Sequence, residues 1–141
     1  MTGKLAIIGA SDFQNPLILK AQEKGLETHV FAWEAGDVGE RTADVFHPIS
    51  IVEHEAILDA CRSIGVDGIC TIGSDLGSIA VNYVACALGL PGNSMECTCV
   101  STNKYLMRER FDACGVPSPR HVVVHRGETP DLSAMEFPLM V

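Results

Sequence analysis

Long apolar runs, an excess of basic charge and closely spaced CxxC cysteine pairs are all missing from this 141-residue sequence. No run approaches the roughly 18 apolar residues of a membrane-spanning helix. The opening MTGKLAII leads straight into an apolar strand rather than into the basic region of a signal peptide. The net charge is −8 and no basic patch is visible, which argues against nucleic-acid binding. We therefore expect a cytoplasmic protein with neither a membrane nor a nucleic acid as partner.

Cysteine and histidine are present, but their spacing does not indicate a metal site. Of the six cysteines, only Cys97 and Cys99 lie close together, and two ligands do not make a zinc site. His121 and His125 could share the face of a strand, but no carboxylate partner is evident. We expect no metal ligands in this chain, and reduced cysteines that pack as small hydrophobic side chains.

Apolar residues make up 47% of the sequence, which is enough for a packed core. Short apolar runs alternate with helix-like segments along the first two thirds of the chain. Pro48 marks the third run as an edge strand, because proline cannot donate a hydrogen bond to a neighbouring strand. The expected strands are 4–9, 28–33, 45–49 and 68–72, and a polar loop is expected over 34–44.

Capping residues and glycines mark the limits of the helices between these strands. The expected starts are Asn15 as a cap before Pro16, Ser50 with Glu53 in a capping box, Ser74 or Asp75, a short turn from Met95, and Ser101 or Thr102; the expected stops are Gly25, Gly65, Gly89 and Gly115.

The order of these elements predicts an α/β fold. Up to about residue 93 the pattern is βαβαβα, which implies a Rossmann-like, three-layer α/β/α domain with a parallel sheet of four to five strands. After Pro117 the rhythm changes, since strands expected at 120–125 and 136–141 have no long crossover helix between them. We therefore expect two domains, 1–101 and 102–141, of which the second begins with a helix and continues with strands.

The first strand is followed by the loop GASDFQNP, in which Gly9, Ser11 and Asp12 are candidate ligand-binding residues. A dinucleotide-binding loop needs the spacing G-x-G-x-x-G, but Ser11 stands where the second glycine would be. Glu34 does lie at the end of the second strand, where a ribose-binding acid would be expected. We favour a loop that contacts a small molecule; dinucleotide binding and a simple turn are the alternatives.

A second strand-to-helix turn, TIGSD, should open at the same edge of the sheet, because the carboxyl ends of parallel strands lie together. Its Ser74 and Asp75 are the candidate residues. The two turns together would form the floor of a pocket. The alternative is that Ser74 and Asp75 only cap their helix.

Lys104 lies in the first turn of the last expected helix, where the helix dipole favours acids over cations. A cation at this position suggests contact with phosphate, and a solvated lysine is the alternative.

Three motifs in order carry a family resemblance: GLPGN at 89–93, N-K-x-x-M-R at 103–108 and G-V-P-x-P at 115–119. This arrangement resembles the ATP-grasp ligase superfamily, which includes biotin carboxylase, carbamoyl-phosphate synthase and the amino-acid ligases. The resemblance is nearest to the carbamoyl-phosphate-synthase-like and amino-acid-ligase-like members. It implies that 1–101 is the Rossmann-like domain before the ATP-grasp domain, and that 102–141 begins the ATP-grasp domain itself.

The resemblance also implies an activity for the complete protein. A carboxylate would be activated by ATP as an acyl phosphate and attacked by a nitrogen nucleophile. Lys104 would contact ATP with support from Arg108, and the Mg²⁺ ligands would lie outside this chain. The wall of the substrate site would be formed by Gly9, Ser11, Asp12, Ser74 and Asp75.

The first loop departs from the G-x-G-x of some purine-pathway members and from the R-G-E of biotin carboxylase. The carboxylate and the nucleophile are therefore not indicated. A homodimer is compatible with an unpaired edge of the sheet.

The chain ends on EFPLMV, which reads as a buried strand that has just begun. The resemblance implies that this strand precedes the second ATP-binding lysine, so we expect the 141-residue chain to be inactive by itself. The alternatives are a self-contained NAD(P)- or nucleotide-binding Rossmann module and a receiver-like domain that uses Asp12 and Asp75.

Overall fold

The structure is a computed structural model that describes residues 3–133 and 135–139. The chain divides into two compact units, Met1–Thr102 and Asn103–Val141, called the first and the second unit below.

The first unit is built on a parallel sheet in the order β3-β2-β1-β4. The strands are β1 (Lys4–Ile8), β2 (Glu27–Phe31), β3 (Val45–His47) and β4 (Gly68–Cys70). The four expected strands and their parallel arrangement are confirmed, and β3 lies at an edge as Pro48 indicated. The last residues of 28–33, 45–49 and 68–72 lie beyond the strands, in the loops that carry the candidate site.

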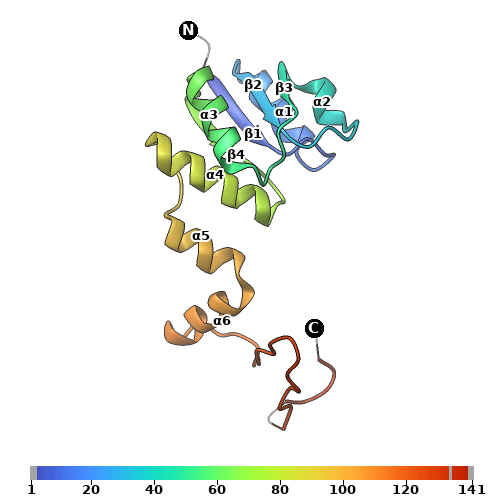
Figure 1. Cartoon of the computed structure of the whole chain (residues 1–141), viewed down its shortest axis with the longest axis vertical. Coiled ribbons are helices and arrows are strands. Elements are labelled where there is room, and N and C mark those ends of the chain that lie inside the picture. The colour runs from blue at the N-terminus through green and yellow to red at the C-terminus, as the bar shows by residue number, and fades with distance from the viewer. Residues whose placement is uncertain (1–2, 134, 140–141) are drawn as a thin grey trace. The chain divides into compact units, whose positions relative to one another are not determined.

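Helices cover both faces of the sheet (Figure 1). The helices of the first unit are α1 (Asn15–Glu23), α2 (Val38–Thr42), α3 (His54–Ile64), α4 (Asp75–Leu88) and α5 (Met95–Thr102), and α6 (Lys104–Ala113) belongs to the second unit. Helices α1 and α2 lie on one side of the sheet, and α3 and α4 lie on the other (Figure 1). The expected three-layer α/β/α fold is confirmed.

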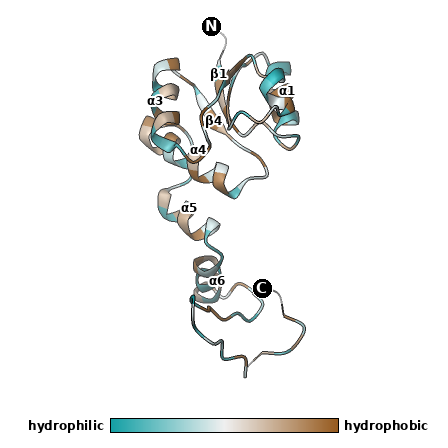
Figure 2. Cartoon of the chain, turned by 45° about the vertical axis from the view of Figure 1, so that its right-hand side comes forward, coloured by the Kyte–Doolittle hydropathy of each residue, from teal (hydrophilic) through white to brown (hydrophobic). Residues whose placement is uncertain are grey.

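Alternation along the strands sends side chains into two cores. Ala6 and Ile8 of β1 pack with residues of α3 and α4, whereas Ile7 packs on the opposite face with Ile18 of α1. Both faces of the sheet are apolar for this reason, and β1 and β4 are largely brown in Figure 2. A sheet buried on both sides needs strands that are apolar throughout, as these short runs are.

The expected packing of the cysteines holds for only some of them. All six cysteines are free. Cys61 is fully buried in the core between the sheet and α3, and burial raises the pKa of its thiol to about 11. Cys70 is partly buried and packs against the core on the other face of the sheet, and burial raises the pKa of its thiol as well. The remaining four, Cys86, Cys97, Cys99 and Cys114, are exposed, so the prediction was wrong for them.

The expected polar loop over 34–44 contains a helix, α2, that the sequence analysis missed. The Glu40 carboxylate accepts hydrogen bonds from the backbone N–H groups of Ala35, Gly36 and Asp37 at 2.8, 2.8 and 2.9 Å. This network fixes the turn that enters the helix. The spacing D-x-x-E at Asp37 and Glu40 was the signal, since it is the spacing of a capping box.

Two of the predicted helix starts in the first unit were wrong by one to three residues. The N-cap position of α1 is Gln14 rather than Asn15, and that of α3 is Glu53 rather than Ser50; neither side chain forms a capping hydrogen bond. One of the two hydrogen bonds of the predicted capping box is present, since the Glu53 carboxylate accepts from the Ser50 N–H at 2.9 Å. By contrast, Ser74 caps α4 as predicted, with its hydroxyl oxygen accepting from the N–H of Gly77.

Helix α6 starts at Asn103, whose side-chain oxygen accepts from the N–H groups of Tyr105 and Leu106. Ser101 and Thr102 do not cap it. Their hydroxyl groups donate to the carbonyl of Thr98 within α5, at 3.1 and 2.8 Å. The four predicted glycine stops, in contrast, all adopt positive φ angles of 65° to 76° directly after their helices: Gly25, Gly65, Gly89 and Gly115.

The strands predicted in the second unit are absent from its described residues. Residues 120–125 have no regular secondary structure, and Val122, Val123 and Val124 are all exposed. A strand is stable only when a neighbour satisfies its backbone hydrogen bonds, and the described part of this unit offers none. Phe137–Leu139 likewise form no strand, and Met140 and Val141 lie outside the described residues.

Across 3–133 and 135–139, every helix is too short or too polar to cross a membrane.

Candidate functional site

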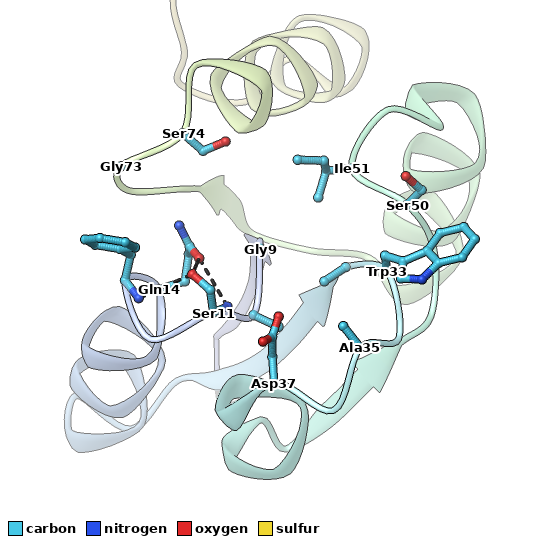
Figure 3. Close-up of a pocket in the computed structure, with 13 residues that line it drawn as sticks. Gly9, Ser11, Gln14, Trp33, Ala35, Asp37, Ser50, Ile51, Gly73 and Ser74 are labelled. Atoms are coloured by element: carbon cyan, nitrogen blue, oxygen red, sulfur yellow. Dashed lines mark hydrogen bonds between the residues drawn. The ribbon is translucent and has the colours of Figure 1, made fainter.

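A cavity of about 320 Å³ opens in the first unit where β1, β2 and β4 end (Figure 3). This is the edge where parallel α/β sheets bind their ligands. The wall is formed by Gly9, Ala10, Ser11, Phe13, Gln14, Ala32, Trp33, Ala35, Asp37, Ser50, Ile51, Gly73 and Ser74.

Gln14 connects the first two loops of the cavity, although the sequence analysis did not select it. Its side-chain oxygen accepts from the N–H and the hydroxyl of Ser11, at 3.2 and 2.6 Å. Its side-chain NH₂ donates to the carbonyl of Ile72 at 2.5 Å. Because Gln14 is only 5% exposed and its side chain is fully engaged, it holds the loop after β1 against the turn after β4.

Gly9 is required by this arrangement. Its φ angle is +99°, and a Cβ at this position would lie 2.9 Å from the Cδ atom of Gln14. In a dinucleotide-binding loop such space is left for pyrophosphate. Here the Gln14 side chain occupies it, so the glycine makes room for an internal side chain.

The turn after β4 is fixed by its own hydrogen bonds. The Thr71 hydroxyl donates to the carbonyl of Ile8 at 2.7 Å, which ties this turn to the end of β1. The Ser74 hydroxyl oxygen accepts from the Gly77 N–H at 2.9 Å. Ser74 therefore caps α4 and also lines the cavity.

The third wall is the segment between β2 and α2. The Gly39 N–H donates to the carbonyl of Ala10 at 2.8 Å, and a Cβ on Gly39 would lie 2.5 Å from that oxygen. Only glycine permits so close an approach, which packs α2 against the loop after β1. The pKa of the Glu40 carboxyl lies below its ordinary value. The hydrogen bond from the Ala35 N–H is the main cause, those from Asp37 and Gly36 add to it, and desolvation acts in the opposite direction.

Two large aromatic side chains of the cavity wall face solvent, Phe13 from the loop after β1 and Trp33 from the loop after β2. Phe13 is 77% exposed and Trp33 is 73% exposed. Figure 3 places Trp33 beside Ser50 at one end of the cavity. The Asp37 carboxylate points into the cavity in the same view.

Of the five predicted substrate-site residues, the structure brings three together around the cavity: Gly9, Ser11 and Ser74. Asp12 and Asp75 are exposed and do not belong to its wall. Gln14, Trp33 and Asp37 were missed. Asp37 could have been found from its capping-box spacing to Glu40, whereas the position of Trp33 depends on the course of the chain after β2.

The two residues predicted to contact ATP lie on α6 in the second unit. Lys104 is the first residue of the helix and is exposed. Arg108 donates from Nη1 to the hydroxyl oxygen of Ser118 at 3.1 Å, and its guanidinium lies 6.0 Å from the ring centroid of Phe111. The Ser118 contact fixes the end of the Arg108 side chain near the G-V-P-x-P segment.

The second unit also gives His121 the carboxylate partners that were not evident from the sequence. Its Nε2 lies 3.5 Å from Glu109 Oε1, and its Nδ1 lies 3.9 Å from Asp112 Oδ2. Glu109 and Asp112 are one turn apart on α6, which brings both to one side of the helix. One ligand atom from each of these three residues lies within 4.8 Å of the others, which is compatible with a metal ion. The two acids contact opposite nitrogens of the ring, however, and both carboxylates are exposed, an arrangement that is common without a metal ion.

Comparisons with known proteins were informative only at the level of structure. No family model matches the chain, and no curated protein sequence matches it. Phosphoribosylglycinamide synthetase from Anaerococcus prevotii aligns with a TM-score of 0.79 and 24% identity, over 90% of this chain and 33% of that protein.

Two further solved structures show the same likeness. N5-carboxyaminoimidazole ribonucleotide synthetase from Thermotoga maritima aligns with a TM-score of 0.73 and 19% identity, over 94% of this chain and 35% of that one. L-amino acid ligase from Bacillus licheniformis aligns with a TM-score of 0.70 and 24% identity, over 99% of this chain and 36% of that one. The chain spans about a third of the length of these proteins. The resemblance inferred from the sequence is therefore confirmed at the level of the fold.

Proposed function

We propose, from a fold shared with ATP-grasp ligases, that this chain is the N-terminal portion of an ATP-dependent carboxylate–amine ligase. In the proposed reaction a carboxylate oxygen attacks the γ-phosphorus of ATP, which gives an acyl phosphate and releases ADP. A nitrogen nucleophile then attacks the carbonyl carbon, forms the C–N bond and releases inorganic phosphate. Catalysis of this kind depends mainly on positioning and on neutralising phosphate charge.

The observation that carries the proposal is the likeness to three ligase and synthetase structures over 90 to 99% of the chain. It agrees with the order of the motifs GLPGN, N-K-x-x-M-R and G-V-P-x-P along the sequence. A fold alone does not imply a function, because one fold carries many activities. The order of the three motifs is what connects the shared fold with the chemistry of these ligases.

The described residues fit one part of an ATP site. Lys104 supplies an exposed point cation at the start of α6, suited to nucleotide phosphate. The neighbouring N–H groups of Tyr105 and Leu106 donate to the side chain of Asn103, so the contribution proposed for this turn is the positive charge of Lys104. Arg108 is proposed to support it from the next turn. The ligands for Mg²⁺ are proposed to lie outside this chain.

The cavity of the first unit is the proposed wall of the substrate site. Gly9, Ser11 and Ser74 line it, and Asp12 and Asp75 follow lining residues directly in the chain. A small-molecule carboxylate and an amine are the proposed substrates of the complete ligase, and this wall is proposed to contact one of them.

The structure weakens the main alternative, a self-contained NAD(P)- or nucleotide-binding Rossmann module. The space in front of Gly9, which a pyrophosphate would need, is filled by Gln14. An experiment separates the two: titration of the chain with NAD⁺ and NADP⁺, followed by the fluorescence of its single tryptophan, Trp33. Saturable micromolar binding would favour the dinucleotide module.

The test of the ligase proposal uses the full-length natural protein that contains this sequence. We expect ADP formation that requires both a carboxylate and an amine, measured with a panel of amino acids and amines. Lys104→Ala should raise KM for ATP by about tenfold or more, corresponding to about 1.4 kcal/mol of lost binding. Lys20→Ala is the matched control, since Lys20 forms an exposed ion pair with Glu23 on α1.

Two results would contradict the ligase proposal. One is the absence of ADP formation with every pair of substrates. The other is an equal effect of Lys104→Ala and Lys20→Ala on KM for ATP. For the 141-residue chain alone we expect no ATP turnover, because it spans only about a third of the compared ligases. A cytoplasmic location and a homodimer remain part of the proposal; sedimentation of the full-length product tests the homodimer.

A further inference from the structure

We infer that the cavity of the first unit binds the amine-bearing substrate: a protonated primary amine carried on a flat apolar body. The inference rests on the proposed function, in which this cavity is part of the substrate site. It adds a chemical class for the ligand and excludes phosphate as the group bound here. Three features of the cavity support it: its backbone donors, its charge and its aromatic residues.

Several backbone N–H groups around the cavity are already occupied by side chains of the protein. The Glu40 carboxylate fills the cluster of N–H groups at Ala35, Gly36 and Asp37, which would otherwise be suited to an external anion. An anionic ligand would have to displace this internal carboxylate.

One N–H group in the loop before α1 and one in the first turn of α4 are occupied in a similar way. The side-chain oxygen of Gln14 accepts from the N–H of Ser11, and the hydroxyl oxygen of Ser74 accepts from the N–H of Gly77. Loops and helix N-termini of this kind commonly bind phosphate through such N–H groups. At these two positions an anion would compete with the protein's own oxygens.

The polar side chains that face the cavity are mainly acceptors of hydrogen bonds. The Asp37 carboxylate points into the cavity and also takes part in the capping box of α2, and the Ser50 hydroxyl stands in the wall (Figure 3). The Ser11 hydroxyl, also in the wall, already donates to Gln14 and accepts from the Phe13 N–H. No lysine, arginine or histidine is among the residues that line the cavity. Arg41 reaches the same loop, but it is not part of the wall, and its Nη1 donates to the carbonyl of Gly36 at 3.1 Å. A carboxylate with hydroxyl oxygens and no paired cation is suited to an ammonium group.

The aromatic residues of the wall indicate the rest of the ligand. Phe13 and Trp33 are 77% and 73% exposed, whereas the next most exposed large apolar side chain described in this unit, Val52, is 57% exposed. Aromatic faces attract cations and pack against flat apolar groups. The volume of about 320 Å³ lies at the small end of ligand cavities. We therefore expect a ligand with a single ring or a body of similar size.

The test uses three probes that share a phenyl ring and differ in charge: phenethylamine, phenylacetate and phenyl phosphate. Each is titrated into the 141-residue chain at pH 7, and binding is followed by the fluorescence of Trp33 and by the NMR signal of its indole N–H. We expect saturable binding of phenethylamine in the millimolar range. The two anions should bind at least about tenfold more weakly, a difference of about 1.4 kcal/mol.

A pair of variants tests the role of Asp37. Asp37→Asn should weaken phenethylamine binding by about fivefold and leave the anions unchanged. Asp59→Asn removes the same charge from an exposed site on α3 that does not line the cavity, and it should leave all three affinities unchanged. The comparison separates a direct contact with Asp37 from the attraction of a cation by the net charge of −8.

Should Asp37→Asn unfold the chain, Phe13→Leu serves as the second variant, because its side chain is exposed and its replacement removes only the aromatic face. It should weaken phenethylamine binding severalfold. The inference is overturned if either anion binds as tightly as phenethylamine, if no probe binds saturably, or if the folded variants bind phenethylamine as the unsubstituted chain does.

These outcomes are independent of the ligase test, because the probes are titrated without ATP. Amine binding without ADP formation by the full-length product would refute only the ligase proposal. ADP formation without amine selectivity in the cavity would refute only the present inference.

Discussion

At the scale of single residues, Gln14 decides the shape of the candidate site. It is buried, and its three hydrogen bonds reach Ser11 in its own loop and Ile72 after β4. Gly9 leaves the space that Gln14 fills. The loop after β1 has the position of a dinucleotide-binding loop, but Gly9 and Gln14 together leave no room in it for pyrophosphate.

The first prediction concerns Gly9→Ala, with Gly65→Ala as its control. Both glycines have a positive φ, 99° and 71°, but a Cβ would meet Gln14 only at Gly9, since nothing lies within 4 Å at Gly65. Gly65→Ala should therefore cost about 1 kcal/mol for the backbone conformation alone. Gly9→Ala should cost about 1–2 kcal/mol more because of overpacking. Urea denaturation measures both, and equal losses would show that the Gln14 contact has no energetic weight.

At the scale of elements, the edge strand β3 is held to β2 by a cluster of rings. His47 Nε2 lies 3.1 Å from His29 Nδ1, and the His47 ring stacks on Phe31 with centroids 4.5 Å apart. Glu27 contacts the other nitrogen of His29 at 3.0 Å. Burial, and to a lesser degree the nearby His29, hold the pKa of His47 below its ordinary value.

This cluster predicts a loss of stability in mild acid. Because the folded pKa of His47 is lowered, the unfolded chain takes up the proton first as the pH falls below about 6.5. The free energy of unfolding should then fall until the pH passes the folded pKa of His47, where both states are protonated. The thermal midpoint, followed by circular dichroism from pH 7.5 to 5, measures this slope.

His47→Gln should flatten the slope, and His125→Gln, a change at an exposed residue of the second unit, should not. An unchanged slope in His47→Gln would assign the pH dependence to other groups. Asp44 does not interfere in this window. Its carboxylate accepts from the N–H and the hydroxyl of Thr28, both at 2.8 Å, and the backbone bond, followed by the hydroxyl bond, lowers its pKa. The stabilisation it gives is lost only at a pH below the ordinary range of aspartate.

At the scale of the whole molecule, the buried core belongs to the first unit. Both apolar clusters, with the residues packed against them, fall between Leu5 and Leu90. In the described part of the second unit, no residue of α6 is buried. The buried core of the sheet is therefore built from residues that precede Thr102.

The corresponding prediction is that residues 1–102 fold as an independent domain. Deletion of 103–141 should leave a cooperative thermal transition within a few degrees of that of the whole chain, a change of less than about 1 kcal/mol. Circular dichroism measures the transition. Loss of cooperativity in 1–102 would show that the second unit completes the core, and would refute the proposed division into two domains.

Much of the first unit could be predicted because its signals are local. Short apolar runs identified the strands, and Gly25, Gly65, Gly89 and Gly115 ended their helices as expected, since the left-handed conformation is cheapest for glycine. The missed helix α2 and the shifted caps depend on which of several polar side chains reaches a backbone N–H group. That choice is made by the folded chain, as Asn103 shows where Ser101 and Thr102 were expected to cap α6.

The sequence by itself determined the α/β class, the parallel arrangement of short buried strands and the position of the candidate site at their carboxyl ends. It also supplied the motif order that leads to the ligase proposal. Only the tertiary structure decided what the site contains. Gln14, Trp33 and Asp37 reach one cavity from separate loops, and several N–H groups beside the cavity donate to the protein's own oxygens. Contacts between residues distant in the chain have no local signal, because they depend on how the loops after β1, β2 and β4 lie together once both faces of the sheet are buried.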